Sequence, residues 1–462
     1  MKKIICLLVI AVFLFSGCQS LFGKQQSGTR LSEEESSIIT PEVLEVPTEQ
    51  HESARVEEYS DIEDIQEDIK LTEEAKQESI NEEKQQNGLV QENAQEAEHT
   101  NKNNIINTFS DKIPDGIFED IQYDKYVVHK NYVLVLSKSL NIRKEPTAES
   151  EVIGKAKHYE KLKLHNEVKG QYISRYDSDS WYEISWLEEN ESKHGYVFSK
   201  LVELREFQFE KMKAEIIKLK EAVNNGTTAY ISNYKNRNGA APLRNGKTTD
   251  DFGIRRYQSA PAYYEPSMDS DFRYIADGAL INTLEEIDGF YKITTSNFAG
   301  EYYVPSKYIS FKNSIEKLEK VIVVDRKNQN EAVFEINDDK LRLISYIYAT
   351  TGEKAKYKLP TDLGYYMAIE KRERFLYLDD VTKEVSGYAP YAIRFSGGTY
   401  IHGVPVEYQK EEEKLTDPGL IEYLVTIGTT PRSHKCVRNY TSHAKYLYDW
   451  AEIGKTAVIV IE

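Results

Sequence analysis

Cysteine is scarce in this chain. The 462 residues hold only three, at positions 6, 18 and 436. Cys6 and Cys18 lie in or beside an apolar N-terminal segment, so Cys436 is the one thiol left for the rest of the protein. A disulfide framework is therefore excluded. A lone thiol is either buried and inert or a reactive nucleophile, and the number of cysteines alone does not decide between the two.

Long apolar runs are also lacking, since a transmembrane helix needs roughly 20 such residues. The run from Ile4 to Phe15 is shorter, follows two lysines and ends in Ser16-Gly17 before Cys18. This pattern predicts a secretory signal over residues 1–17. Phe15 to Cys18 resembles a bacterial lipobox, which implies a lipid on Cys18 and a membrane-anchored lipoprotein of the cell envelope, in the periplasm or on the outer surface. The alternative is an ordinary signal peptide with a chance cysteine.

Basic and aromatic residues are rare in the next part of the chain. Residues 31–100 contain 22 acidic and 4 basic side chains, a net charge of −18 against −17 for the whole protein. Such a composition cannot bury enough apolar area to offset chain entropy. We expect residues 18–125 to form an acidic, disordered tether that starts at the lipidated cysteine. The remainder is near neutral, so no nucleic-acid partner is expected.

From residue 126 the chain becomes rich in tyrosine, valine, isoleucine and phenylalanine, which favour strands. Short strands are predicted at 132–136, 161–167, 181–186 and 195–198. The segments Leu140-Asn141-Ile142-Arg143 and His194-Gly195-Tyr196-Val197 follow the order of the bacterial Src-homology-3-like domain, which residues 126–205 resemble. The resemblance implies a small barrel that binds wall peptides or packs on a catalytic partner; a spacer without a ligand is the alternative.

Residues 206–226 are predicted to form a connector helix. Its apolar side chains recur at steps of three and four, the spacing of one helical face: Phe209, Met212, Ile216, Leu219 and Val223. Residues 227–312 are again strand-like, and Gly300 to Ile309 resembles the end of the same barrel type. We expect a second, divergent Src-homology-3-like domain there.

The C-terminal part carries several short motifs after a plain strand at 320–325. In chain order they are Thr350-Thr351-Gly352, Pro360-Thr361, Tyr400-Ile401-His402-Gly403 and Ser433-His434-Lys435-Cys436-Val437-Arg438-Asn439. Together they resemble the L,D-transpeptidase (YkuD-type) catalytic domain, over residues 318–462. The resemblance implies a mainly β fold with a short helix after the cysteine, so the whole chain is expected to be two barrels followed by a mostly β catalytic domain.

Two departures from the family pattern stand out. Lys435 occupies the place where the family usually has glycine. The segment between His402 and Ser433 is longer than usual and carries the charged run Glu411 to Lys414, which we expect to form a surface loop or lid.

The chemistry can be argued from the residues. A thiol attacks an acyl group as thiolate, and a nearby histidine can take its proton. We expect Cys436 to be the nucleophile, His402 the base and His434 its partner. Backbone N–H groups of Lys435 and Cys436 could stabilise an oxyanion.

Substrate contacts follow from the same motifs. Arg438 would bind a substrate carboxylate, with Ser433, Gly403 and Tyr400 beside it, whereas His443 on the following helix is expected to face solvent. One cysteine and two histidines without ligand spacing do not make a metal site, and no cofactor is expected.

The implied reaction takes place on peptidoglycan stem peptides: Cys436 forms a thioester with a tetrapeptide, and an amine resolves it into a crosslink. Two alternatives remain open. Water could replace the amine, giving an L,D-carboxypeptidase or amidase-type hydrolase, or the domain could be degenerate and the protein a wall-binding lipoprotein.

Overall fold

The computed structural model describes residues 104–462 except 190, 338–339, 356–357, 379–381, 383 and 412–413, and all described residues belong to one compact unit. The predicted signal peptide, Cys18 and the acidic stretch 31–100 lie outside the described residues. Within residues 104–462, apart from those gaps, no helix has both the length and the apolar character required to cross a membrane.

The predicted tether is wrong for its last part. Strand β1 (Ile105–Thr108) pairs with a barrel strand, and β2 (Ile117–Glu119) extends the sheet of the C-terminal domain. The acidic run has ended by this point, and Ile117 is buried while Ile113 and Tyr123 pack against the main core. These apolar side chains provide the burial that the preceding acidic segment lacks.

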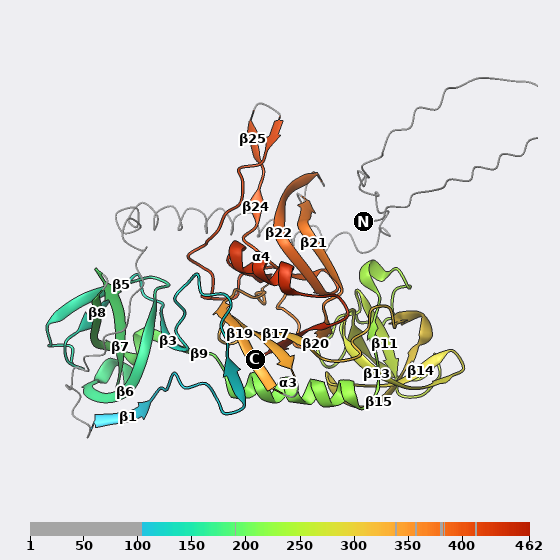
Figure 1. The fold of residues 1–462 in the computed structure, drawn as a ribbon, viewed down its shortest axis with the longest axis horizontal. Coiled ribbons are helices and arrows are strands. Elements are labelled where there is room, and N and C mark those ends of the chain that lie inside the picture. Colours follow the sequence, from blue (N-terminus) through green and yellow to red (C-terminus); the bar gives the residue numbers. More distant parts are fainter. Residues whose placement is uncertain are drawn as a thin grey trace, which may run out of the picture. The chain divides into compact units, whose positions relative to one another are not determined.

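The first barrel follows the predicted strand pattern (Figure 1). Its sheet runs β5-β4-β8-β7-β6-β3-β9, with β1 added on β6. The strands are β3 (Asn131–Val135), β4 (Ser139–Arg143), β5 (Val152–Lys157), β6 (Lys161–Ile173), β7 (Ser178–Glu188), β8 (Glu191–Phe198) and β9 (Val202–Glu206). The barrel has a core of its own, in which Val133, Leu164 and Ile184 are buried together.

The second barrel has the same topology. Its sheet runs β12-β11-β15-β14-β13-β10-β16, so the seven strands follow the same spatial order as β3 to β9 of the first barrel. They are β10 (Thr227–Ile231), β11 (Ser259–Tyr263), β12 (Phe272–Ala276), β13 (Leu280–Ile287), β14 (Phe290–Thr295), β15 (Phe298–Pro305) and β16 (Ile309–Ser310). This identity of strand order supports the interpretation of residues 227–312 as a second, divergent copy.

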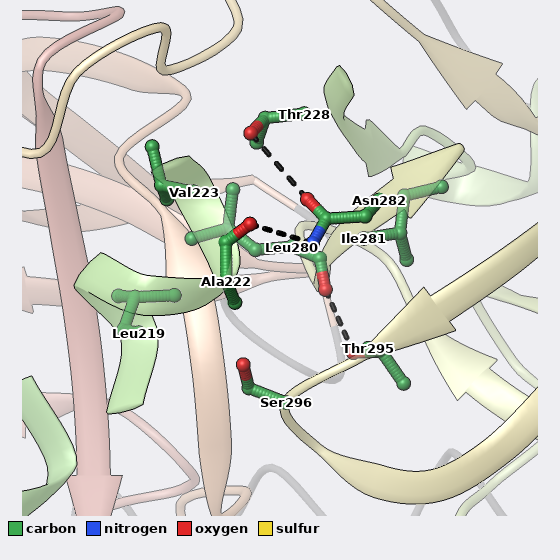
Figure 2. Close-up of a pocket in the computed structure, with 9 residues that line it drawn as sticks. All are labelled: Leu219, Ala222, Val223, Thr228, Leu280, Ile281, Asn282, Thr295 and Ser296. Carbon is green, nitrogen blue, oxygen red and sulfur yellow. Dashed lines mark hydrogen bonds between the residues drawn. The ribbon is translucent and has the colours of Figure 1, made fainter. Parts of the chain in front are cut away.

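Helix α3 (Phe209–Asn224) lies between the two barrels in sequence, and its five predicted apolar residues are all buried. Figure 2 shows where its end meets the second barrel. Asn282 on β13 donates a hydrogen bond from Nδ2 to the carbonyl oxygen of Ala222, at 2.7 Å. The space left between them is only about 10 Å³, which is room for at most one water molecule. This junction is a packed contact and not a ligand site.

The C-terminal domain contains two sheets, a hairpin and a helix. The larger sheet runs β2-β19-β18-β17-β28-β20, and the smaller one β21-β22-β23-β27 with β24 paired to β22. The elements are β17 (Lys320–Asp325), β18 (Asn330–Asn337), β19 (Lys340–Tyr348), β20 (Gly364–Met367), β21 (Glu370–Leu378), β22 (Val385–Ser396), β23 (Thr399–His402), β24 (Val406–Glu407), β25 (Gln409–Glu411), β26 (Lys414–Thr416), β27 (Val437–Arg438), α4 (Thr441–Trp450) and β28 (Thr456–Ile461).

Alternation along β17 explains the layering of this domain. Val321 and Val323 belong to the buried cluster that contains α3. Ile322 and Val324 point to the opposite face, since strand side chains alternate, and join a cluster with Phe395 on β22. The larger sheet is therefore covered by α3 on one face, and by the smaller sheet, α4 and part of the second barrel on the other.

The expected loop between His402 and Ser433 contains a two-stranded hairpin, β25 and β26, drawn in Figure 1 as a projection from the domain. The predicted charged run lies at its tip, where residues 412–413 are outside the described part.

Candidate active site

The short parallel pairing of β23 with β27 brings the two motifs together. In its register Ile401 lies opposite Val437, and His402 opposite Arg438. Ile401 and Val437 are both buried in the core. Because side chains alternate along a strand, His402 and Arg438 share the other face, and Cys436 comes directly before β27. The sequence motifs thus converge at one sheet edge.

His402 is held in one orientation. Its Nδ1 lies 2.6 Å from the carbonyl oxygen of Gly403, so Nδ1 carries the proton and donates it, which leaves Nε2 as the basic nitrogen. The pKa of His402 is lowered to about 4, mainly by burial; the bond to Gly403 opposes this shift, and the nearby Arg438 cation adds to it. The imidazole is therefore neutral near pH 7 and able to accept a proton.

The loop that carries Cys436 is pinned by the segment after β19. Thr350 and Arg438 exchange two backbone hydrogen bonds, at 2.8 and 3.0 Å. Gly352 forms an isolated parallel β-bridge with Ser433. A Cβ at position 352 would lie 2.7 Å from the backbone nitrogen of Lys435. Only glycine permits this close approach, which gives the Thr-Gly motif a structural role beneath the cysteine.

Lys435 explains why glycine is usual at its position. Its φ is +85°, in the region that residues with a Cβ rarely adopt. Two contacts hold it there. Its Nζ lies 2.6 Å from Oδ2 of Asp362, and its carbonyl oxygen accepts a hydrogen bond from Oγ1 of Thr361 at 2.8 Å. Lys435 therefore keeps a positive φ that glycine would adopt freely, and the lysine does so at the cost of local strain.

The thiol of Cys436 is half-buried, so part of its surface remains accessible. Its Sγ lies 3.9 Å from the carbonyl oxygen of Gly398, in the turn between β22 and β23. Sequence reasoning did not single out this turn. No pattern in the sequence brings Gly398 to the cysteine 38 positions later.

The other predicted site residues are more enclosed than expected. Arg438 is 4% exposed and Tyr400 is fully buried, with its ring stacked on Phe375 at 4.2 Å. The hydroxyl of Ser433 donates to the carbonyl oxygen of Cys436, and Gly403 accepts the bond from His402. These contacts give Ser433 and Gly403 positioning roles. His434, two residues before the cysteine, is half-buried.

The prediction that His443 faces solvent is wrong. Its side chain is fully buried, with Nε2 at 2.9 Å from Oγ of Ser345 and Nδ1 at 3.3 Å from Oε1 of the buried Glu331. The same carboxylate accepts a hydrogen bond from Nδ2 of Asn439, whose backbone N–H donates to the carbonyl oxygen of His402. The helical periodicity alone did not reveal this network, because the partners of His443 lie on strands β18 and β19.

Two parts of the chain match models of known protein families. Residues 319–460 match the model of the L,D-transpeptidase catalytic domain, and residues 138–203 match that of the bacterial SH3 domain. The C-terminal domain is an L,D-transpeptidase catalytic domain. The predicted fold is confirmed with it: a mostly β chain in which an SH3-like region precedes this domain, with a short helix near the C-terminus.

Similar solved structures were also found. One is a fused zinc-dependent amidase, peptidase and peptidoglycan-binding protein from Clostridium acetobutylicum, at 19% identity and a TM-score of 0.22, covering 31% of this chain and 51% of that one. This chain thus spans about half of that protein's length. L,D-transpeptidase 1 of Mycobacterium tuberculosis and the enzyme of Mycobacterium smegmatis are each 14% identical, with TM-scores of 0.23; the matches cover 39% and 44% of this chain and 83% and 78% of theirs. No curated protein sequence matches the chain.

Proposed function

We propose that this protein is a cysteine-dependent L,D-transpeptidase of the cell envelope that crosslinks peptidoglycan stem peptides. One observation carries the proposal: β23 ends at the neutral, oriented His402 and pairs with β27, which begins directly after Cys436. A thiol, a base and a third group that orients the base are the parts that acyl transfer through a covalent intermediate needs.

The residues divide the first half-reaction as follows. Cys436 attacks the carbonyl between the third and fourth residues of a stem tetrapeptide, and its proton passes to Nε2 of His402. Backbone N–H groups of Lys435 and Cys436 stabilise the oxyanion. The carbon–nitrogen bond breaks, the terminal D-amino acid leaves with the proton from His402, and a thioester remains on Cys436.

In the second half-reaction, an amine of a neighbouring stem attacks the thioester. His402 accepts its proton, the carbon–sulfur bond breaks, and the thiol of Cys436 is regenerated as the crosslink forms. Arg438 acts on His402 through its charge, and we retain the prediction that it also favours a substrate carboxylate. His434 supports the loop beside the nucleophile.

The localisation is proposed with the function. A lipid on Cys18 and an acidic tether would hold the catalytic domain within reach of the wall from a membrane. Lipid labelling of the full-length protein, with Cys18→Ala as the control, tests this part independently of catalysis.

Product analysis tests the reaction. The full-length protein is incubated with disaccharide tetrapeptide, and the products are separated by mass. The proposal expects crosslinked dimer and released D-amino acid, both absent with Cys436→Ala. Tripeptide without dimer would identify a hydrolase, and no product at all would favour a wall-binding protein with a degenerate domain.

A further inference from the structure

The second barrel sends a loop to the turn beside the catalytic cysteine. This loop, Asn233–Gly239, is the first part of the connection from β10 to β11 and includes the short 3-10 helix η6 (Tyr234–Asn236). Asn233 is fully buried, and its Nδ2 donates to the carbonyl oxygens of Gly239 and Ser259 at 3.1 and 2.8 Å. The loop is therefore a fixed part of the barrel and not a loose connection.

A buried carboxylate ties this loop to the catalytic domain. Asp277 accepts the backbone N–H of Asn233 on Oδ1 at 2.6 Å. Its Oδ2 accepts Nη1 of Arg394 at 2.7 Å and the backbone N–H of Gly397 at 3.0 Å. The side chains of Asp277 and Arg394 are 2% and 8% exposed. A buried ion pair with its remaining lone pairs satisfied is costly to break, so it fixes geometry.

The tied turn is the one that touches the nucleophile. Gly397 precedes Gly398, whose carbonyl oxygen lies 3.9 Å from Sγ of Cys436. The side chain of Gln258, at the start of β11, approaches Gly397 from the barrel side, and its Oε1 accepts the backbone N–H of Lys235 at 3.0 Å. Asp277, directly after β12, and Gln258, directly before β11, thus both reach the turn from the second barrel.

Tyr234 is the side chain of this loop that packs against the catalytic domain. Its ring lies 4.2 Å from the guanidinium carbon of Arg394. It also lies beside Tyr400. Burial raises the pKa of the Tyr400 hydroxyl most, and the neighbouring Tyr234 raises it further. Tyr400 precedes His402 by two residues on β23, so both side chains lie on one face of that strand.

The loop also brings positive charge. Lys235 and Arg237 are exposed, and both pack their cationic groups over the ring of Tyr234, at 5.6 and 6.0 Å. No carboxylate among residues 104–462, gaps aside, forms an ion pair with either. Cations beside an aromatic ring suit a peptide that carries free carboxylates.

We propose that the second barrel completes the substrate site: the Asn233–Gly239 loop is one wall of it, and Tyr234 contacts the bound peptide while Lys235 and Arg237 attract its carboxylates. The inference rests on the proposed function, because it takes a stem peptide as the ligand. It assigns the second barrel a role in specificity that a spacer or wall anchor would not have.

Binding to the full-length protein tests this wall without requiring turnover. Affinity for disaccharide tetrapeptide is measured by calorimetry in the Cys436→Ala background, with and without Tyr234→Ala. The proposal expects at least about tenfold weaker binding, since aromatic anchors in such sites dominate affinity. Tyr264→Ala is the matched control. Tyr264 is an exposed tyrosine of the same barrel that packs on Tyr302 instead. Thermal unfolding of each variant, together with Tyr234→Phe, separates lost contact from lost folding.

The outcomes are distinct. Weaker binding by Tyr234→Ala at an unchanged melting temperature, with Tyr264→Ala unaffected, supports the wall. Equal affinity of Cys436→Ala and Cys436→Ala/Tyr234→Ala overturns it. A Cys436→Ala protein that binds no tetrapeptide overturns it as well. If Tyr234→Ala unfolds, the folded double variant Lys235→Ala/Arg237→Ala replaces it, and unchanged affinity there overturns the proposal. Binding by Cys436→Ala combined with no turnover by the unaltered protein would count against the proposed function alone.

Discussion

At the scale of single residues, the site depends on how His402 is buried. An imidazole in water has a pKa near 6.5, and burial against the sheet, with Arg438 nearby, lowers that of His402 to about 4. The resting imidazole is therefore neutral and can accept a proton.

This pKa predicts the acid side of the pH profile. Protonation of His402 removes the base, so the acylation rate of Cys436 should fall only as pH drops toward about 4 and should show no inflection near 6.5. The measurement is the rate of Cys436 acylation by a carbapenem between pH 4 and 7, with folding followed by circular dichroism. A rate that halves near pH 6.5 would show that His402 titrates as an exposed histidine.

Lys435 offers a second residue-scale prediction. Lys435→Gly loses the ion pair with Asp362 but relieves the positive φ, whereas Lys435→Ala loses the pair and keeps the strain. We expect the alanine variant to be less stable than the glycine variant by about 1 kcal/mol. Urea unfolding of both variants measures the difference. Equal midpoints and slopes would mean that the backbone at Lys435 is not strained.

At the scale of elements, the catalytic loop owes its shape to a neighbouring segment. A Cβ on Gly352 would lie 2.3 Å from the carbonyl oxygen of Leu359 as well as against Lys435. Gly352→Ala should displace the Cys436 loop and lower the acylation rate by at least about 100-fold, the loss typical when a reacting group is misplaced by an ångström. Acylation kinetics check this, and near-normal rates would show that the loop does not depend on this contact. Both barrels should remain folded in the variant, which their aromatic NMR signals would report.

The elements that sequence reasoning found are those with local patterns. The 3-4 spacing of Met212, Ile216 and Leu219 predicts α3, and all three are buried as one face. The Thr-Gly, His-Gly and Cys motifs indicate the catalytic domain. By contrast, the pairing of Asp277 with Arg394 spans 117 residues and leaves no local pattern. The buried contact of His443 on α4 is with Glu331 on β18, which is also far away in the sequence. Long-range polar contacts of this kind are decided by tertiary packing.

At the scale of the whole molecule, the two barrels differ in how far their hydrophobic cores are continuous with that of the catalytic domain. The first barrel buries Val133, Leu164 and Ile184 in a cluster of its own. The second barrel also has a small cluster of its own, with Tyr263 and Phe290, but its Ile231 and Val304 belong to a cluster that continues into the catalytic domain. The barrels share a topology, but the second one is structurally part of the catalytic unit.

This difference predicts how the fragments behave. Isolated residues 126–207 should fold, and isolated residues 227–312 should not, because their apolar face would lose its cover. Circular dichroism and NMR dispersion of the two fragments check the contrast. A cooperative, well-dispersed second barrel would contradict the shared core.

The most direct test of the account concerns the thiol. The full-length protein is incubated with a carbapenem, an acylating mimic of the stem peptide, and its intact mass is recorded. The account predicts one covalent adduct on the unaltered protein and none on Cys436→Ala, with His402→Gln slower by about 100-fold or more. A folded protein that forms no adduct, or one whose adduct persists in Cys436→Ala, would contradict the assignment of Cys436 as the nucleophile.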